Sequence, residues 1–360
     1  MANGSSFTRK KIVSIGGGNG PYLVGRGLRD YDVDITIICT PADNGGSSGR
    51  IRDEFGKVLP PGDLRRGIMA LMNTEDVMDH DFFNHRFGGN GLDIDELTDH
   101  SLGNIILLAA HQRFGPIQGT AYVAKKFGVK GKVLPMSTDS THLHVMLNDG
   151  TEVQGETNID LRDIEDERLI VREWLQPQAF ICKEAADAIR TADVVILGPG
   201  DLYTSIIPNL LVSGVQDAMK ESKAKFICIM NQMDKWSETR GFTAADFLQT
   251  MIDYGIGRPA FDAVIVDSSP IPPEVADFYA RKEKSFPVKV GDATRVHKLA
   301  RILHPVDLLH ITEPNPDRLV RHDSQKLAHA ILEVVYMEER YAYDRIGTSE
   351  LVRKIGERRP

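Results

Sequence analysis

Short runs of apolar residues alternate with longer segments of helical periodicity along most of the chain. The apolar runs predict buried strands at residues 12–15, 35–39, 194–197, 226–229 and 261–266. The periodic segments predict helices at residues 101–114, 208–221, 243–254 and 324–336. Short apolar strands separated by helices are typical of a mainly parallel sheet with helices on both faces. We therefore expect an α/β fold.

One stretch departs from this alternation. Residues 142–147 and 151–159 flank Asn148-Asp149-Gly150, and this pattern predicts a β-hairpin. We interpret it as an insertion, at about residues 140–160, in a single α/β domain that spans residues 11–345. Residues 1–10 and 346–360 are expected to be terminal tails. The acidic segment 73–100 is interpreted as a solvated connection, with a mobile cover over a site as the alternative.

Composition and charge narrow the class of protein. The 360 residues are 41% hydrophobic and 26% charged, as in an ordinary globular protein. The chain has 43 Lys and Arg against 51 Asp and Glu, and the resulting net charge of −8 argues against a general nucleic-acid binder. Its three cysteines have no metal-ligand spacing and are expected to be free thiols in a reducing cytosol. We see no signal peptide and no bilayer-spanning run, so we expect a cytoplasmic protein without membrane insertion.

Three loops rich in small residues follow predicted strands. The first is Gly16-Gly17-Gly18-Asn19-Gly20, the second extends from Thr40 to Arg50, and the third from Gly198 to Asn209. Ligands of open α/β sheets bind at the carboxyl ends of strands, and free N–H groups at the start of a helix attract phosphate. We therefore predict a phosphate or diphosphate cradle, with plain turns or a flexible surface loop as the alternatives. The glycine spacing matches neither the dinucleotide-binding fingerprint nor a P-loop.

Two acidic residues and several polar residues are the chemical candidates. Asp43 follows a strand end, where a carboxylate can meet a ribose hydroxyl, a substrate hydroxyl or a magnesium ion. Asp63 either caps the helix that extends to Met72 or has a functional role. Ser205 either binds phosphate or caps the following helix. The candidate ligand-binding residues of the loops and of the apolar helix at 102–110 are Gly17, Gly18, Asn19, Asn44, Gly46, Ser47, Ser48, Arg50, Asn104, Gly198, Gly200, Tyr203, Thr204, Ser205 and Asn209.

Four motifs together resemble one family of bacterial proteins. They are Ile15–Gly20, Ala42–Arg50, Leu59–Asp63 and Leu197–Ser205. In order and spacing they are similar to the gluconeogenesis factor family (YvcK type), which is related to the 2-phospho-L-lactate transferases (CofD-like), over about residues 11–337. The resemblance implies a Rossmann-like fold with an added hairpin and a homodimer.

The resemblance also implies two functions. The gluconeogenesis factors are linked to cell shape and envelope synthesis during growth on non-glycolytic carbon, and they are thought to bind UDP-sugars. Tyr279 and Arg321 match their uridine-nucleotide contacts. The transferases use magnesium to move a phospholactyl group from a nucleoside diphosphate donor to a deazaflavin hydroxyl.

The chain departs from the family pattern near the predicted site. The family usually has a second Asp where this chain has Asn44, and a Ser where it has Asp201, and the loop 231–240 is longer here. Two hypotheses remain open: a regulatory protein that binds a nucleotide-sugar diphosphate, and a magnesium-dependent transferase in which Asp43 and Asp63 are catalytic and Asp43 holds Mg²⁺. The glycine spacing disfavours a third, a nicotinamide oxidoreductase.

Overall fold

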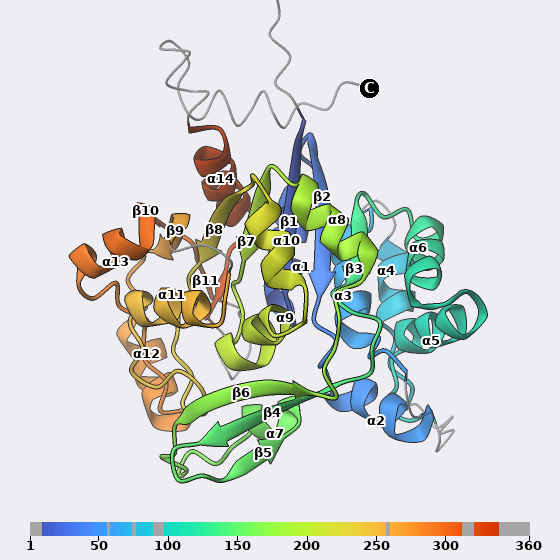
Figure 1. Ribbon diagram of the computed structural model, residues 1–360, viewed down its shortest axis with the longest axis horizontal. Helices are drawn as coiled ribbons and strands as arrows, with labels where there is room; N and C mark the ends of the chain where they lie inside the picture. Colours follow the sequence, from blue (N-terminus) through green and yellow to red (C-terminus); the bar gives the residue numbers. More distant parts are fainter. Residues whose placement is uncertain are drawn as a thin grey trace, which may run out of the picture.

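A seven-stranded parallel sheet forms the centre of the computed structural model, which describes residues 9–55, 58–73, 77–88, 97–256, 260–311 and 320–337 (Figure 1). The strand order is β10-β9-β8-β7-β1-β2-β3, and every neighbouring pair is parallel. The strands are β1 (Lys10–Gly16), β2 (Val33–Cys39), β3 (Lys132–Pro135), β7 (Val194–Leu197), β8 (Lys225–Ile229), β9 (Phe261–Asp267) and β10 (Ala300–Val306). The predicted fold class is confirmed, and β3 and β10 are strands that the prediction missed.

Helices cover both faces of this sheet because the strands are apolar on both sides. Val13 and Ile15 of β1 belong to one apolar cluster, and Ile12 belongs to the other. One face is covered by α1 (Asn19–Leu28), α3 (Gly62–Leu71), α5 (Leu102–Phe114), α6 (Pro116–Lys126) and α14 (Ser324–Val335). The other face is covered by α8 (Lys183–Thr191), α10 (Val215–Glu221), α11 (Ala244–Asp253) and α13 (Ala293–Leu299).

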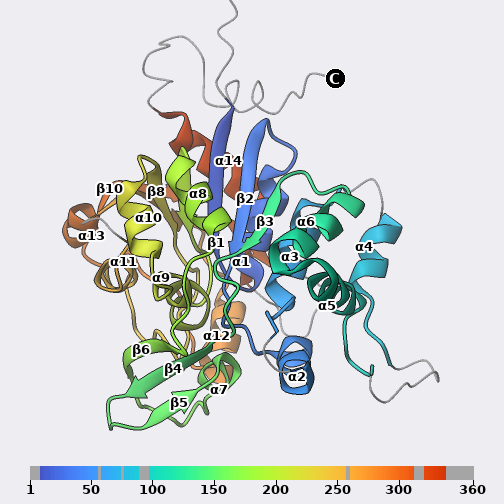
Figure 2. The same cartoon turned by 45° about the vertical axis from the view of Figure 1, so that its right-hand side comes forward.

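The predicted hairpin is part of a three-stranded antiparallel sheet, which we call the inserted sheet. It contains β4 (His142–Leu147), β5 (Glu152–Gln154) and β6 (Ile170–Gln176), with the short helix α7 (Glu156–Asp160) after β5. The second strand therefore ends at Gln154, five residues before the prediction. The Asn44 Oδ1 atom accepts the Thr157 N–H and so satisfies a donor in the first turn of α7, a tertiary contact that local sequence does not reveal. Two views place the inserted sheet beneath the carboxyl ends of the parallel strands (Figures 1 and 2).

Several helix boundaries were predicted correctly from capping residues. Thr243 and Asp246 form a capping box at the start of α11, and Asp323 accepts two backbone N–H groups at the start of α14. The predicted helix at 208–221 is instead divided into α9 (Ile207–Leu210) and α10. Gly214 separates them at φ +91°, a left-handed conformation that interrupts a helix. Before α9 lies η1 (Leu202–Ile206), a π-helical turn. Neither η1 nor α9 has a side-chain cap, so the alternative interpretation of Ser205 as a helix cap is not supported.

The remaining described elements lie at the edges of the fold. They are α2 (Gly46–Phe55), α4 (Val77–Asn84), α12 (Pro273–Lys282) and the antiparallel pair β11 (Leu309–Ile311) and β12 (Val320–His322). The predicted tails lie largely outside the described residues, and so does part of the acidic segment 73–100, of which α4 is described. Within the described ranges, no helix is long and apolar enough to cross a bilayer.

The sheet has a switch point between β1 and β7. From β1 the chain adds β2 and β3 on one side, and from β7 it adds β8, β9 and β10 on the other. The loops that leave β1 and β7 therefore diverge, and the crevice between such loops is where open α/β sheets bind ligands.

Candidate functional site

The two glycine loops that follow β1 and β7 meet at this switch point. Gly20, in the first turn of α1, lies so close to the Pro199 carbonyl that a Cβ at Gly20 would be 1.6 Å from its oxygen. A Cβ at Gly200 would lie 3.8 Å from the Gly17 carbonyl oxygen. The predicted meeting of the Gly18 and Gly200 turns is therefore present in the structure.

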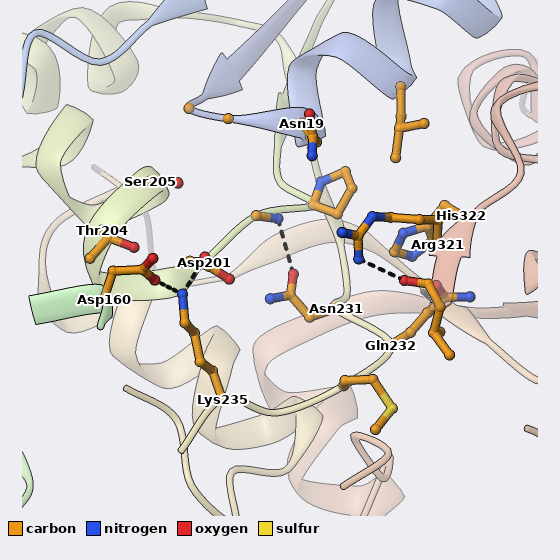
Figure 3. Close-up of a pocket in the computed structure, with 18 of the residues that line it drawn as sticks. Asn19, Asp160, Asp201, Thr204, Ser205, Asn231, Gln232, Lys235, Arg321 and His322 are labelled. Atoms are coloured by element: carbon orange, nitrogen blue, oxygen red, sulfur yellow. Dashed lines mark hydrogen bonds and ion pairs between the residues drawn. The ribbon is translucent and has the colours of Figure 1, made fainter. Parts of the chain in front are cut away.

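A cavity of about 520 Å³ opens beside these loops (Figure 3). Its wall contains residues from α1, α12, β12, the loops after β1, β2, β7 and β8, and the helix α7 of the inserted sheet. The predicted residues that line it are Gly17, Gly18, Asn19, Asp43, Asp63, Gly200, Thr204, Ser205, Tyr279 and Arg321. The unpredicted polar residues of the wall include Arg66, Glu156, Asp160, Asn231, Lys235 and His322.

The other predicted residues lie outside the cavity wall, and several of them hold the loops in place. They are Asn44, Gly46, Ser47, Ser48, Arg50, Asn104, Gly198, Tyr203 and Asn209. The Ser48 hydroxyl accepts the Gly62 N–H at 3.0 Å, and the Ser47 hydroxyl accepts the Asn104 side-chain N–H at 3.0 Å. The Asn209 side chain donates to the Ser205 carbonyl at 2.8 Å. These contacts fix the backbone around the cavity rather than its surface.

Glu238, which the sequence analysis missed, occupies the donors at the start of η1. Its Oε2 atom accepts the N–H groups of Tyr203 at 2.8 Å and Thr204 at 3.2 Å, and its Oε1 atom accepts the Thr204 hydroxyl at 2.7 Å. A carboxylate of the chain itself therefore takes the place that the prediction assigned to a ligand phosphate at Tyr203 and Thr204. Ser205 and the loop Gly17–Asn19 line the cavity beside this turn.

The acidic side chains of Asp43, Asp63 and Glu156 lie on one side of the cavity. Asp63 accepts the Gly18 N–H at 2.9 Å and an Arg66 N–H at 3.2 Å, so it ties α3 to the first glycine loop rather than capping its own helix. Burial raises the pKa of Asp63 to about 6, and the Asp43 carboxylate adds to the rise. Burial also raises the pKa of Glu156 to about 7, again with contributions from Asp43 and Asp63. The three side chains come from α3, the loop after β2, and the inserted sheet.

These oxygen donors fit a magnesium ion that is shared with a ligand. Mg²⁺ commonly binds one or two carboxylates together with substrate phosphates, and it keeps several waters. Asp43 can serve as such a ligand, whereas the Asn44 carbonyl already accepts from Thr157. Among the described residues, the group of three carboxylates within 4.8 Å of one another is Asp160, Asp201 and Glu238, which surrounds the Lys235 ammonium. That group is therefore already paired with a lysine.

The opposite wall comes from α12 and β12. The Tyr279 hydroxyl accepts the Val320 N–H at 2.9 Å, and Arg321 donates to the Val320 carbonyl at 2.9 Å. Burial lowers the pKa of His322 to about 4, so its ring is neutral near neutral pH. Its Nε2 atom lies 3.1 Å from the Met230 carbonyl and donates to it, which leaves Nδ1 as an acceptor.

Fold and cavity together define a doubly wound α/β protein with a candidate ligand site at the switch point of its sheet. The family model described as 2-phospho-L-lactate transferase CofD matches residues 12–308, and the chain belongs to this family.

Relatives and solved structures agree with this assignment over most of the chain. The gluconeogenesis factor of Halalkalibacterium halodurans is 40% identical over 330 residues, which cover 90% of this chain and 96% of the relative. The gluconeogenesis factor of Bacillus subtilis is 38% identical over 91% of this chain and 98% of its own. A crystal structure of a UPF0052 family member from Bacillus halodurans matches with a TM-score of 0.80 and 37% identity, covering 91% of this chain and all of that one. The family resemblance seen in the sequence is confirmed.

Proposed function

We propose that the chain is a regulatory protein that binds a nucleotide-sugar diphosphate, a UDP-sugar, in the switch-point cavity. The observation that carries this proposal is the meeting of the loops around Gly18 and Gly200, which brings the start of α1 and the Ser205 hydroxyl to one edge of the cavity. The volume of about 520 Å³ lies within the usual range of roughly 300–1,000 Å³ for small-molecule sites. Tyr279 and Arg321 form the wall assigned to the uridine.

The proposal includes a cellular role. We propose that the protein acts in the cytoplasm as a homodimer and that ligand binding links carbon metabolism to cell shape and envelope synthesis. The names of its relatives, gluconeogenesis factors, support the metabolic part of this role.

Binding of UDP-N-acetylglucosamine in the absence of divalent cations is expected to tighten about tenfold between pH 8 and pH 6. The ligand brings two phosphate charges into a cavity that holds Asp63 and Glu156, whose pKa values are about 6 and about 7. Protonation of these acids as the pH falls through that window removes repulsion, so affinity rises toward low pH. Isothermal titration calorimetry measures the effect, and added Mg²⁺ is expected to restore affinity at pH 8.

Uridine is the matched control because it lacks the phosphates and is expected to show little pH dependence. Absence of binding heat at both pH values, with pure folded protein and high ligand concentration, would rule out this ligand class for the cavity.

A second candidate function is magnesium-dependent transfer of a phosphate-bearing group from a nucleoside diphosphate donor to a hydroxyl acceptor. It is favoured by Asp43 and Asp63 beside the glycine loops and by the description of the family. In such a reaction Asp43 would hold Mg²⁺, which would neutralise charge on the phosphates. Asp63 would orient the acceptor hydroxyl.

If the chain is a transferase, Asp43→Asn is expected to reduce turnover by at least 100-fold, because the amide removes the charged metal ligand. Turnover is measured by chromatography of the donor after incubation with Mg²⁺ and acceptor. Asp139→Asn, which changes an acid outside the cavity wall, is the control and should leave turnover unchanged. A donor that stays intact with the unsubstituted protein would exclude that donor.

A further inference from the structure

The loop after β8, residues 231–240, carries a lysine into the cavity wall. Lys235 lines the cavity, and its side chain points toward Asp160 and Asp201 (Figure 3). Its ammonium lies 2.8 Å from Asp201 Oδ2 and 3.5 Å from Glu238 Oε1, and it also pairs with Asp160. One cation is thus held by three acids from separate elements.

The three acids differ in burial and in their other contacts with the chain, so they do not bind the Lys235 ammonium in the same way. Glu238 is fully buried and accepts the N–H groups of Tyr203 and Thr204, so it stays in place whether or not Lys235 moves. Asp160 and Asp201 are partly exposed and line the cavity with Lys235 itself. Burial, together with Glu238 and Glu156, raises the pKa of Asp201, and Arg321 opposes that rise. The pair of Lys235 with Asp201 is therefore open to competition from another anion.

The position of this pair connects it to the phosphate cradle. Asp201 directly follows Gly200, whose Cα faces the Gly17 carbonyl across the loop junction. Arg66 pairs with the buried Asp63 and Arg321 donates to the Val320 carbonyl, whereas two of the partners of Lys235 are partly exposed acids that line the cavity. A lysine has three donors on a flexible four-carbon stem, so it can change partner by side-chain rotation without backbone movement.

We propose that Lys235 is a phosphate-contacting residue of this cavity, and that its ammonium pairs with Asp160 and Asp201 until a ligand diphosphate replaces these two carboxylates. The inference rests on the proposed function and names the cation that would serve it. It also explains how the chain accommodates Asp201 beside a phosphate site. While the cavity is empty, Lys235 balances the charge of Asp201, and Asp201 keeps Lys235 from pairing with other groups.

The test is a double-mutant cycle on UDP-N-acetylglucosamine binding, measured by calorimetry without divalent cations at one pH. Lys235→Met is expected to weaken binding at least tenfold because a charge-assisted contact is lost. Asp201→Asn is expected to tighten binding severalfold because it releases Lys235. In the Lys235→Met background, Asp201→Asn should have a much smaller effect, since no lysine is left to release and the remaining gain is the loss of one negative charge.

Three controls make the result specific. Lys183→Met removes a lysine of α8 that pairs with Asp187 outside the cavity wall, and it should bind as the unsubstituted protein does. Lys235→Arg keeps the cation and should retain most of the affinity. Uridine binding should be unaffected by Lys235→Met, because the nucleoside has no phosphate for the lysine to contact.

The outcomes separate this inference from the function on which it rests. If the unsubstituted protein binds the ligand and Lys235→Met binds equally well, Lys235 is not a phosphate contact, and the proposed function stands without it. If the unsubstituted protein does not bind, both are overturned. If a thermal melt shows that Lys235→Met does not fold, Asp201→Asn decides the question. Unchanged or weaker binding by that variant contradicts the proposal that Asp201 competes with the ligand for Lys235.

Discussion

Replacing Gly20 with alanine is expected to destabilise the protein by about 3 kcal/mol or more and to abolish ligand binding. The added Cβ would lie 1.6 Å from the Pro199 carbonyl oxygen, and backbone cannot rotate away as a side chain can. Gly20 lies in α1, where alanine alone would favour the helix by about 1 kcal/mol, so a net loss of stability can arise only from the tertiary contact. Chemical denaturation measures the loss.

Gly45→Ala is the matched control. The Cβ of an alanine at this position would meet no atom closer than 3.5 Å, which is ordinary van der Waals contact. It is expected to change the free energy of unfolding by less than about 1 kcal/mol. Equal stability of the Gly20→Ala and Gly45→Ala variants would show that the two glycine loops do not abut as described.

Asp63→Ala is expected to lower ligand affinity by more than tenfold and to cost about 2 kcal/mol of stability. The substitution removes the acceptor of the Gly18 N–H and the partner of Arg66, so the first glycine loop loses the contact that fixes it to α3. Calorimetry with UDP-N-acetylglucosamine and denaturant unfolding give the two quantities.

Asp63→Asn separates the hydrogen bond from the charge. The amide oxygen can still accept the Gly18 N–H, while the negative charge beside Asp43 is removed. Without divalent cations, this variant is expected to bind the ligand at pH 8 at least as well as the unsubstituted protein. If it behaves like Asp63→Ala instead, the charge of Asp63 is itself required, which favours a role in holding a cation.

The strands and the glycine loops were predictable because their signals are local. Each central strand is a continuous apolar run, and residues such as Gly17, Asp43 and Gly200 follow those runs directly. A parallel sheet brings the carboxyl ends of its strands to one edge, so the meeting of loops distant in sequence followed from the fold class.

The rest of the cavity depends on contacts that no local pattern encodes. Glu156 and Asp160 reach it because the inserted sheet lies under the strand ends, and Lys235 reaches it from the loop after β8, where Glu238 binds η1 behind the cavity wall. The sequence alone suggests that the Thr204 hydroxyl is available to a ligand, but this hydroxyl donates to the Glu238 carboxylate, 34 residues away.

The Glu238 carboxylate accepts the first backbone N–H groups of η1, and this affects how the protein binds a ligand. Because Glu238 satisfies Tyr203 and Thr204 without any ligand, this turn already has its final shape in the free protein. Ordering a loop on complex formation typically costs affinity, and a framework organised in advance avoids that cost. Ligand binding at this edge is therefore expected to change side-chain conformations and to leave the backbone of η1 in place.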